Sequence, residues 1–195
     1  MKKMLLILAL SVFGFANAQK GTILVGGNIS YNSNKIERED APAKTDAFAF
    51  SPKVGYQFHD NWTAGVEFAL GSSKSTLGEG EGKSKDYKIG GFVRYTYPLS
   101  ETFSVFADLG VGYQNQKFKS YESGSLTSTN EGKGIYTGIT PALFINMKKG
   151  FGLNFSIGGL GYETLNYDIS GGDVDSSQFY FNFGKTVNIG ISKNF

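Results

Sequence analysis

The chain has 195 residues, among which are no cysteine, a single histidine and only four prolines. Without cysteine it cannot contain a disulfide framework, a thiol nucleophile, a zinc ribbon or an iron–sulfur cluster, nor a lipid-modified cysteine after a signal peptide. One histidine excludes a metal site made of several histidines. Glycine is abundant, with 27 residues, but it follows no collagen period and 15% of the chain is aromatic, which excludes collagen-like and disordered classes.

The chain also lacks a hydrophobic run long enough to cross a membrane as a helix. Two lysines at the start precede a short apolar run, Met4–Phe15, and the small residues at Ala16–Ala18 suit a cleavage site. A membrane-anchoring helix, the alternative, needs about 20 apolar residues. We therefore predict a secretory signal peptide over residues 1–18 and a single mature domain over residues 19–195.

No excess of charge of either sign remains once this leader is removed. The whole chain has 19 Lys and Arg against 17 Asp and Glu, and the leader holds two of the basic residues and none of the acidic ones. The side chains of the mature chain are therefore balanced in charge. Because nucleic-acid binding needs a concentrated basic patch, no nucleic-acid partner is expected.

The chain does contain an alternation of apolar and polar residues with a period of two, which runs from Thr22 onward without a sustained helical stripe. This periodicity predicts an all-β mature chain of eight strands. The strands are expected near Thr22–Tyr31, Ala47–Phe58, Trp62–Gly71, Asp86–Tyr97, Phe103–Phe118, Gly134–Met147, Phe151–Tyr162 and Phe179–Phe195.

The connections between these strands alternate in length. Three are tight and turn-like, near His59–Asn61, Pro98–Thr102 and Lys148–Gly150. The other four are long and polar, and transmembrane barrels show the same asymmetry, with short periplasmic turns and long extracellular loops. The long connections are Asn32–Asp46, Ser72–Lys85, Lys119–Lys133 and Asn166–Gln178.

The two faces of the predicted strands distinguish a membrane barrel from a soluble one. One parity carries large apolar residues such as Phe50, Val66 and Leu109, with aromatic residues beside the short turns, as at a membrane interface. The other parity is small, polar and poor in charge, whereas the wet exterior of a soluble barrel has roughly 25–35% charged residues. We therefore predict an eight-stranded antiparallel up-and-down transmembrane β-barrel; a soluble, lipocalin-like barrel is the alternative.

Four of the few charged residues on the inward parity are expected at one height in the lumen. Lys53 and Glu67 lie at equal distances from the turn between the second and third strands, and Arg94 and Asp108 lie at similar distances from the turn between the fourth and fifth. Buried charges are tolerated when they pair, so we predict a network of these four residues that fills the lumen. Its interpretation as packing is favoured over ion conduction or catalysis.

Two prolines and a glycine-rich stretch interrupt the pattern. Pro52 and Pro141 fall inside predicted strands of a closed barrel, where no free edge accommodates a missing N–H, so we expect a bulge at each. The stretch Gly158–Gly161 is expected to bend or shift its strand, which leaves the facing of the later residues open.

The leader, the eight amphipathic strands and the final segment Val187–Phe195, which alternates apolar residues and ends in Phe, resemble the outer-membrane β-barrel family that includes OmpX and the transmembrane domain of OmpA. The resemblance covers Thr22–Phe195. It implies a place in the outer membrane of a Gram-negative cell, in contact with its lipid. It also implies that the barrel-assembly machinery reads the last strand, with Phe195 as an assembly signal.

Signals for chemistry are few. His59 is expected in a periplasmic turn with no nucleophile or acid beside it, and the run Gly78–Gly82 differs from a phosphate-binding loop. Asp168, Asp173 and Asp175 offer oxygen ligands for calcium, but their spacing matches no EF-hand loop. We therefore expect no catalytic residue, no cofactor, no metal site and no enzymatic activity.

Three classes of function remain open. The sequence favours a non-enzymatic integral outer-membrane protein, a monomer whose barrel anchors surface loops for envelope integrity, adhesion or binding of a surface partner. The alternative is a small transport channel or a conduit for apolar molecules, which in so narrow a barrel needs a continuous cavity or a gap in the wall. A lipid-modifying enzyme, the third class, needs a converging nucleophile, base and acid that the sequence does not offer.

Overall fold

The computed structural model describes residues 21–37, 42–147, 149–169 and 172–195, and almost all of these residues lie in eight β-strands. The predicted leader lies outside the described residues. The strands are β1 (Ile23–Ile36), β2 (Ala43–His59), β3 (Trp62–Leu77), β4 (Gly80–Pro98), β5 (Phe103–Glu122), β6 (Ser125–Asn146), β7 (Phe151–Ile169) and β8 (Gly172–Asn194).

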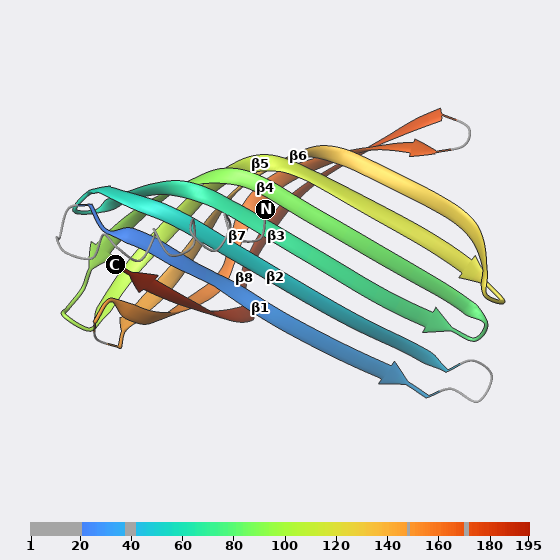
Figure 1. The fold of residues 1–195 in the computed structure, drawn as a ribbon, viewed down its shortest axis with the longest axis horizontal. Helices are drawn as coiled ribbons and strands as arrows, with labels where there is room; N and C mark the ends of the chain where they lie inside the picture. Colours follow the sequence, from blue (N-terminus) through green and yellow to red (C-terminus); the bar gives the residue numbers. More distant parts are fainter. Residues whose placement is uncertain (1–20, 38–41, 148, 170–171) are drawn as a thin grey trace, which may run out of the picture.

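Each strand pairs antiparallel with the next one along the chain, and β8 returns to β1 to close the ring (Figure 1). The predicted fold class, an all-β, up-and-down, eight-stranded barrel, is therefore confirmed. The three predicted tight turns, after β2, β4 and β6, lie together at one end. No helix in the described part of the chain is long and apolar enough to cross a membrane.

The strands are longer than the apolar pattern predicts, with 14 to 23 residues each, whereas a tilted strand crosses a membrane in about 9–11 residues. The predicted long loops are therefore wrong as loops: the segments are mostly strand, and hairpins close at turns such as Gly78–Glu79 and Ser123–Gly124. Residues 38–41 and 170–171 of the other two connections lie outside the described residues. A ladder with water on both faces needs no apolar alternation, so polar residues continue it.

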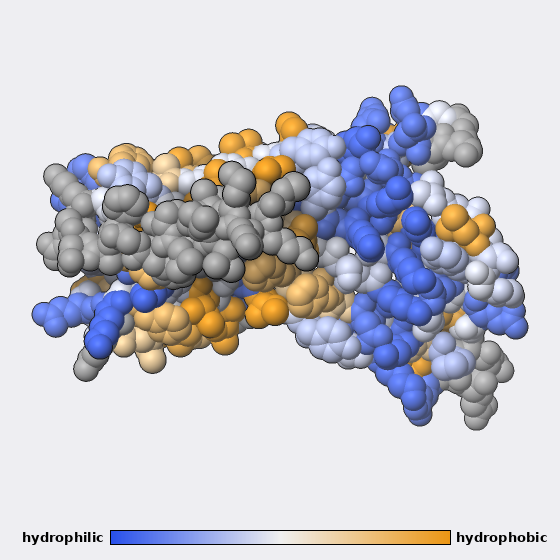
Figure 2. Space-filling model, viewed as in Figure 1, coloured by the Kyte–Doolittle hydropathy of each residue, from blue (hydrophilic) through white to orange (hydrophobic). Residues whose placement is uncertain are grey.

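Large apolar side chains point away from the barrel axis. Of the described residues, the buried hydrophobic ones are only Leu24, Phe92, Phe106 and Ala142. In Figure 2 the hydrophobic residues form a band toward one end of the molecule, with hydrophilic residues beyond it on either side. This is the reverse of a soluble barrel and suits a barrel surrounded by hydrocarbon.

The two prolines behave differently. Near Pro141 the pairing of β6 with β7 shifts register between Ile139 and Ala142, as predicted. At Pro52 the predicted bulge is wrong, because the register of β2 with β3 is the same on both sides of the proline. Pro52 lacks the N–H for a ladder bond, so pairing is interrupted there without the insertion of a residue.

Gly158 begins the predicted shift in β7. Its φ of 116° is a conformation that glycine adopts readily and other residues rarely do. The pairing of β7 with β8 changes register between Ser156 and Gly158. Beyond it the outward parity changes, since Ile157 and Tyr162 are both exposed. The β7–β8 hairpin therefore leaves the direction of the other strands, and its tip stands apart from theirs in Figure 1.

The ring closes through a short contact between β1 and β8. Register pairs run from Leu24–Asn194 to Gly27–Ile191, and Ile23 and Phe195 exchange backbone hydrogen bonds of 3.1 and 3.0 Å. Beyond Gly27, β1 continues to Ile36 with only β2 paired to it among the described strands, while β8 runs with β7. We call the gap between these parts of β1 and β8 the open seam.

Candidate functional site

The inward-facing charges of β2, β4 and β5 meet at one level of the lumen. Asp108 on β5 accepts hydrogen bonds of 2.6 and 2.8 Å from the Arg94 guanidinium on β4, and one of 2.7 Å from the Lys53 ammonium on β2. Arg94 and Asp108 are opposite each other in register and both are buried. One carboxylate therefore serves two cations.

Glu67 on β3 adds the second anion. Its Oε2 lies 3.8 Å from Lys53 Nζ, and its Oε1 accepts a 2.9 Å hydrogen bond from the Tyr136 hydroxyl on β6. The four residues predicted as a lumen network thus come from four adjacent strands and lie in one layer. We call Lys53, Glu67, Arg94, Asp108 and Tyr136 the lumen cluster.

Sequence reasoning missed the aromatic part of this layer. The Phe106 ring lies under the Arg94 guanidinium, 3.7 Å from ring centroid to Cζ, and the Phe92 ring lies 5.0 Å from Lys53 Nζ. Such contacts stabilise a cation where water is scarce. The signal for these rings and for Tyr136 was present, because they are bulky residues on a parity that otherwise carries small ones.

Cavities lie on the two sides of the lumen cluster. A cavity of about 230 Å³ on the side of the long hairpins is lined by Lys53, Glu67 and Tyr136. Another of about 150 Å³ on the side of the short turns is lined by Gln57, Arg94 and Phe106. A smaller cavity of about 50 Å³ beside Lys53, Arg94 and Asp108 shares lining residues with both, so side chains narrow the bore, as expected for a barrel of eight strands.

A second ion pair and a larger cavity lie farther toward the long hairpins. Lys88 on β4 and Glu163 on β7 are 2.8 Å apart and line a polar cavity of about 400 Å³. Tyr167 donates a hydrogen bond of 2.7 Å to Gln116 across this cavity. The inward position of Glu163 was not predicted from the sequence, because the register shift at Gly158 reverses which residues of β7 face inward.

At the open seam, backbone groups of β1 have no paired strand among the described residues of β8. The N–H and C=O of Ile23 both face β8, and successive residues of a strand face alternate edges. Since β1 pairs with β2 without a register shift, alternate residues beyond Gly27 direct their N–H and C=O toward the open seam. These residues are Ile29, Tyr31, Ser33 and Lys35.

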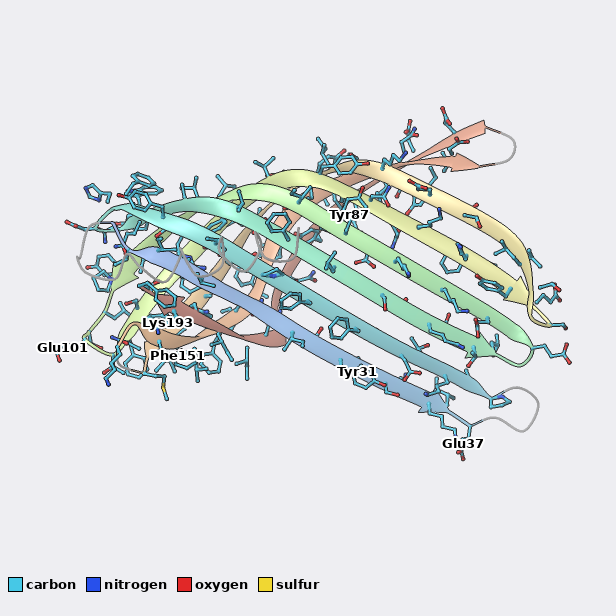
Figure 3. The ribbon with its side chains drawn as sticks, viewed as in Figure 1. Tyr31, Glu37, Tyr87, Glu101, Phe151 and Lys193 are labelled. Atoms are coloured by element: carbon cyan, nitrogen blue, oxygen red, sulfur yellow. The ribbon has the colours of Figure 1, made fainter. Side chains whose placement is uncertain are left out.

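Apolar side chains on both sides of the open seam are unusually exposed. Ile29 is 70% exposed and Tyr31 is 68% exposed on β1, where Tyr31 points outward (Figure 3). Phe179 is 67% and Phe181 is 65% exposed on β8. These four fractions are the highest of the exposed large hydrophobic residues described, and all four residues lie where the pairing of β1 with β8 has ended.

On the outer face of the hairpins, acidic side chains are held by lysines. Asp46 accepts hydrogen bonds from Lys44 at 2.7 Å and Ser33 at 2.6 Å, which lower the pKa of its carboxyl to about 2. Glu81 lies 2.5 Å from both Lys74 and Lys83, and these two cations lower its pKa as well.

The other residues considered from sequence form no reactive site. His59 is exposed at the end of β2. Gly78–Gly82 forms the tip of the β3–β4 hairpin, and Asp168, Asp173 and Asp175 lie exposed on the β7–β8 hairpin. In the part of the chain that the structure describes, no group of His, Asp and Glu is placed to hold a metal ion.

A closed ring of eight strands with an apolar exterior and an internally paired, charged lumen defines a small transmembrane β-barrel protein. The sequence model of the outer membrane protein beta-barrel domain matches residues 4–186. The chain therefore belongs to this family, and the outer membrane is its location.

Solved outer-membrane barrels are similar to the chain at low sequence identity. The outer membrane protein OprG of Pseudomonas aeruginosa is 11% identical with a TM-score of 0.46, covering 92% of this chain and 99% of that one. Ail of Yersinia pestis, in complex with the heparin analogue sucrose octasulfate, is 16% identical with a TM-score of 0.42 and coverages of 90% and 99%. The translocator domain of the autotransporter NalP of Neisseria meningitidis is 14% identical, with a TM-score of 0.45 and coverages of 100% and 75%. No curated protein matches the chain.

Proposed function

We propose that the protein is a non-enzymatic surface-binding barrel, which holds an extended segment of a partner protein as an added strand along the open seam. The observation that carries the proposal is the edge of β1 beyond Gly27, where pairing with the described residues of β8 ends and four alternate residues direct their N–H and C=O groups away from β2. An exposed sheet edge binds extended peptides through main-chain hydrogen bonds, and pockets for alternate side chains give specificity.

The exposed apolar residues beside this edge support the same proposal. Ile29 and Tyr31 project from β1, and Phe179 and Phe181 project from β8 on the other side of the gap. An added strand would cover both pairs. The lower part of the edge, at Ile29, lies level with lipid-facing residues such as Phe50, where unsatisfied backbone groups cost several kcal/mol each.

The lumen cluster and the strand lengths agree with a role in anchoring and presentation. Beside the cluster the bore narrows to a cavity of about 50 Å³, which disfavours the passage of solutes. Strands of up to 23 residues carry the sheet well beyond the membrane. We therefore expect the purified protein to give no steady conductance in planar lipid bilayers.

A photo-crosslinking experiment tests strand addition. p-Benzoylphenylalanine is placed at Tyr31, beside the open seam, and as a matched control at Tyr87, which faces outward from the fully paired strand β4. In living cells we expect a discrete protein adduct from position 31 and none from position 87. Equal adducts at both positions, or none at 31, contradict the proposal.

Two variants at Ser33 make the test specific to the backbone. Ser33→Pro removes an N–H that faces the open seam while leaving the β1–β2 ladder bonds in place. Ser33→Ala removes the hydroxyl that donates to Asp46 and retains the N–H. We expect the adduct from position 31 to be lost in Ser33→Pro and retained in Ser33→Ala; an adduct that survives the proline contradicts strand addition.

The second candidate, a conduit for apolar molecules, is favoured by one observation. The cavity of about 230 Å³ is lined by Asn28 on β1 and Tyr180 on β8, which lie on the two sides of the open seam. Its lining also includes Lys53, Glu67 and Lys88, which suit polar contents. Uptake of a fluorescent fatty acid into protein-containing vesicles, above that of protein-free vesicles, would favour the conduit.

We further propose that Phe195 acts in assembly, as the last residue of the strand that the barrel-assembly machinery reads. Its backbone pairs with Ile23 and so takes part in closing the ring. The signal peptide over residues 1–18 and the monomeric state belong to the same proposal of a singly inserted surface barrel.

A further inference from the structure

Lysines gather on the outward face of one side of the barrel wall, directly beyond the apolar band. Lys74, Lys83 and Lys119 lie opposite one another on β3, β4 and β5. Nearer the membrane, Lys85 and Lys117 lie opposite each other on β4 and β5. We define the lysine face as Lys74, Lys83, Lys85, Lys117, Lys119 and Lys133.

The aromatic residues of β4 place these lysines relative to the bilayer. Tyr97 and Tyr87 both face outward at the two ends of the apolar part of β4. Ten residues at ~3.4 Å each, tilted by ~40°, span about 26 Å, close to the ~25 Å apolar band of outer-membrane barrels. Tyr87 then marks the outer interface (Figure 3). Lys85 and Lys83 follow it at about 5 and 10 Å above the hydrocarbon, at the depth of lipid headgroups.

The lysine face has too few anions of its own. Glu81 lies between Lys74 and Lys83, and Glu131 lies 3.5 Å from both Lys117 and Lys133. Lys85 and Lys119 have no ion pair with any described residue. Like charges directly opposite each other on neighbouring strands repel. Six cations against two anions on these strands leave this face with an excess of positive charge.

Among the side chains that the structure describes, the excess lies on one side of the barrel. On the outward face of β1 and β2, Lys35 pairs with Glu37 and Lys44 pairs with Asp46. On the β7–β8 hairpin the exposed charges are acidic: they are Asp168, Asp173 and Asp175. A general need for solubility does not explain such asymmetry.

From this placement we propose that the lysine face binds the phosphate groups of anionic lipid headgroups in the outer leaflet of the outer membrane. The lysines project sideways from the wall, in the same direction as the lipid-facing Ile89 and Tyr113 beneath them. At that depth the barrel wall is next to the headgroup layer of the lipid. Basic clusters next to a membrane-spanning segment attract anionic headgroups, which neutralise the repulsion between the lysines.

The two unpaired lysines supply the test. Lys85→Gln/Lys119→Gln removes two charges that no protein anion balances, whereas Lys35→Gln/Lys44→Gln removes two that Glu37 and Asp46 balance. Each full-length protein is reconstituted in phosphatidylcholine nanodiscs with either bisphosphorylated or dephosphorylated lipid A. Native mass spectrometry then counts the lipid that remains bound.

We expect the unaltered protein and the Lys35→Gln/Lys44→Gln control to retain the phosphorylated lipid in preference to the dephosphorylated one. At about fivefold for each lysine near an anionic headgroup, Lys85→Gln/Lys119→Gln should weaken this preference roughly 25-fold. Heat-modifiable migration on a gel checks that both variants are folded. Equal retention of the two lipids by the unaltered protein, or equal losses in both variants, overturns the proposal.

A soluble probe distinguishes lipid from a free anion. The bisphosphorylated glucosamine disaccharide without acyl chains has the same phosphates but no place in the bilayer. We expect it to displace the lipid only weakly. Displacement at concentrations comparable to those of the lipid shows that the lysine face is a site for soluble anions and overturns the proposal in its lipid form.

Discussion

At the scale of single residues, Asp108 is the side chain on which the lumen cluster depends most. It accepts hydrogen bonds from both Arg94 and Lys53. Its replacement in Asp108→Ala leaves the buried Arg94 and the half-buried Lys53 with Glu67 as the remaining anion of the cluster, and breaking a buried ion pair typically costs about 3–5 kcal/mol. We expect a loss of that size in equilibrium urea unfolding in lipid vesicles. The exposed turn residue Asp60 provides the control, since Asp60→Ala removes the same charge and should change little.

Asp46 provides a prediction of pH dependence. Lys44, Ser33 and Tyr31 donate to its carboxylate, which lowers its pKa from 3.8 to about 2. Because the folded pKa lies below the unfolded one, these contacts stabilise the β1–β2 hairpin fully above about pH 4 and lose that effect as the pH falls through about 2. An NMR titration of the carboxyl carbon should show this low pKa, and it should rise in Ser33→Ala and in Lys44→Gln. A carboxyl that titrates normally contradicts the contacts.

Part of this chemistry was predictable from sequence, and part was not. Counting from the short turns places Lys53, Glu67, Arg94 and Asp108 at one height because a barrel strand rises regularly from its turn. The same count fails for Glu163, because the shift at Gly158 reverses which residues of β7 face inward. Tyr136 and Lys88 follow the regular inward parity of their strands, so their positions in the lumen could have been predicted from the alternating pattern.

At the scale of elements, Gly158 decides the path of the β7–β8 hairpin. Its φ is positive, and a Cβ added there would meet the carbonyl of Asn182 on β8. Gly124, in the β5–β6 turn, also has a positive φ but nothing within 4 Å of an added Cβ. Gly124→Ala should therefore cost only backbone strain, about 1–3 kcal/mol. Gly158→Ala should cost more in the same unfolding assay; equal losses contradict the steric role.

The closing contact of β1 with β8 makes its own prediction. The contact between β1 and β8 has few paired residues, and deletion of Phe195 removes both of its backbone hydrogen bonds with Ile23. The variant Phe195→Ala keeps those bonds and removes only the ring. We expect heat-modifiable migration and protease protection in cells to decline in both variants and more strongly in the deletion. If Phe195→Ala and the deletion decline equally, the aromatic ring accounts for the whole effect, and the role of Phe195 lies in recognition by the assembly machinery.

The number and order of strands could be predicted because apolar alternation is imposed wherever one face meets lipid and the other meets a packed lumen. The lengths could not, because that alternation ends at the interface while the ladder continues. The segment Ser72–Lys85 illustrates this: Leu77 is its one large apolar residue, yet it pairs with register intact around Gly78–Glu79. Its strand character comes from hydrogen bonds between backbones, which leave little trace in composition.

At the scale of the whole molecule, the aromatic residues at the two ends of the apolar band fix the thickness of bilayer that the barrel matches. The spacing from Tyr97 to Tyr87 corresponds to about 26 Å. Folding yield in phosphatidylcholine vesicles of increasing acyl-chain length should therefore pass through a maximum near that hydrocarbon thickness, because mismatch in either direction exposes apolar surface or buries polar groups. A yield that rises steadily with chain length contradicts this placement of the band.

The brevity of the contact between the first and last strands has a consequence for how the barrel forms and fails. All other neighbouring strands are joined by hairpins, so their pairing can start at a turn and extend from it. The contact between β1 and β8 joins the first and last strands, so it can form only after the other strands have paired. We therefore expect the pairing of β1 with β8 to form last during folding and to dissociate first during unfolding. A barrel opened there becomes a sheet with two unpaired edge strands. Such edges pair with those of other chains, so this opened form is the one expected to aggregate.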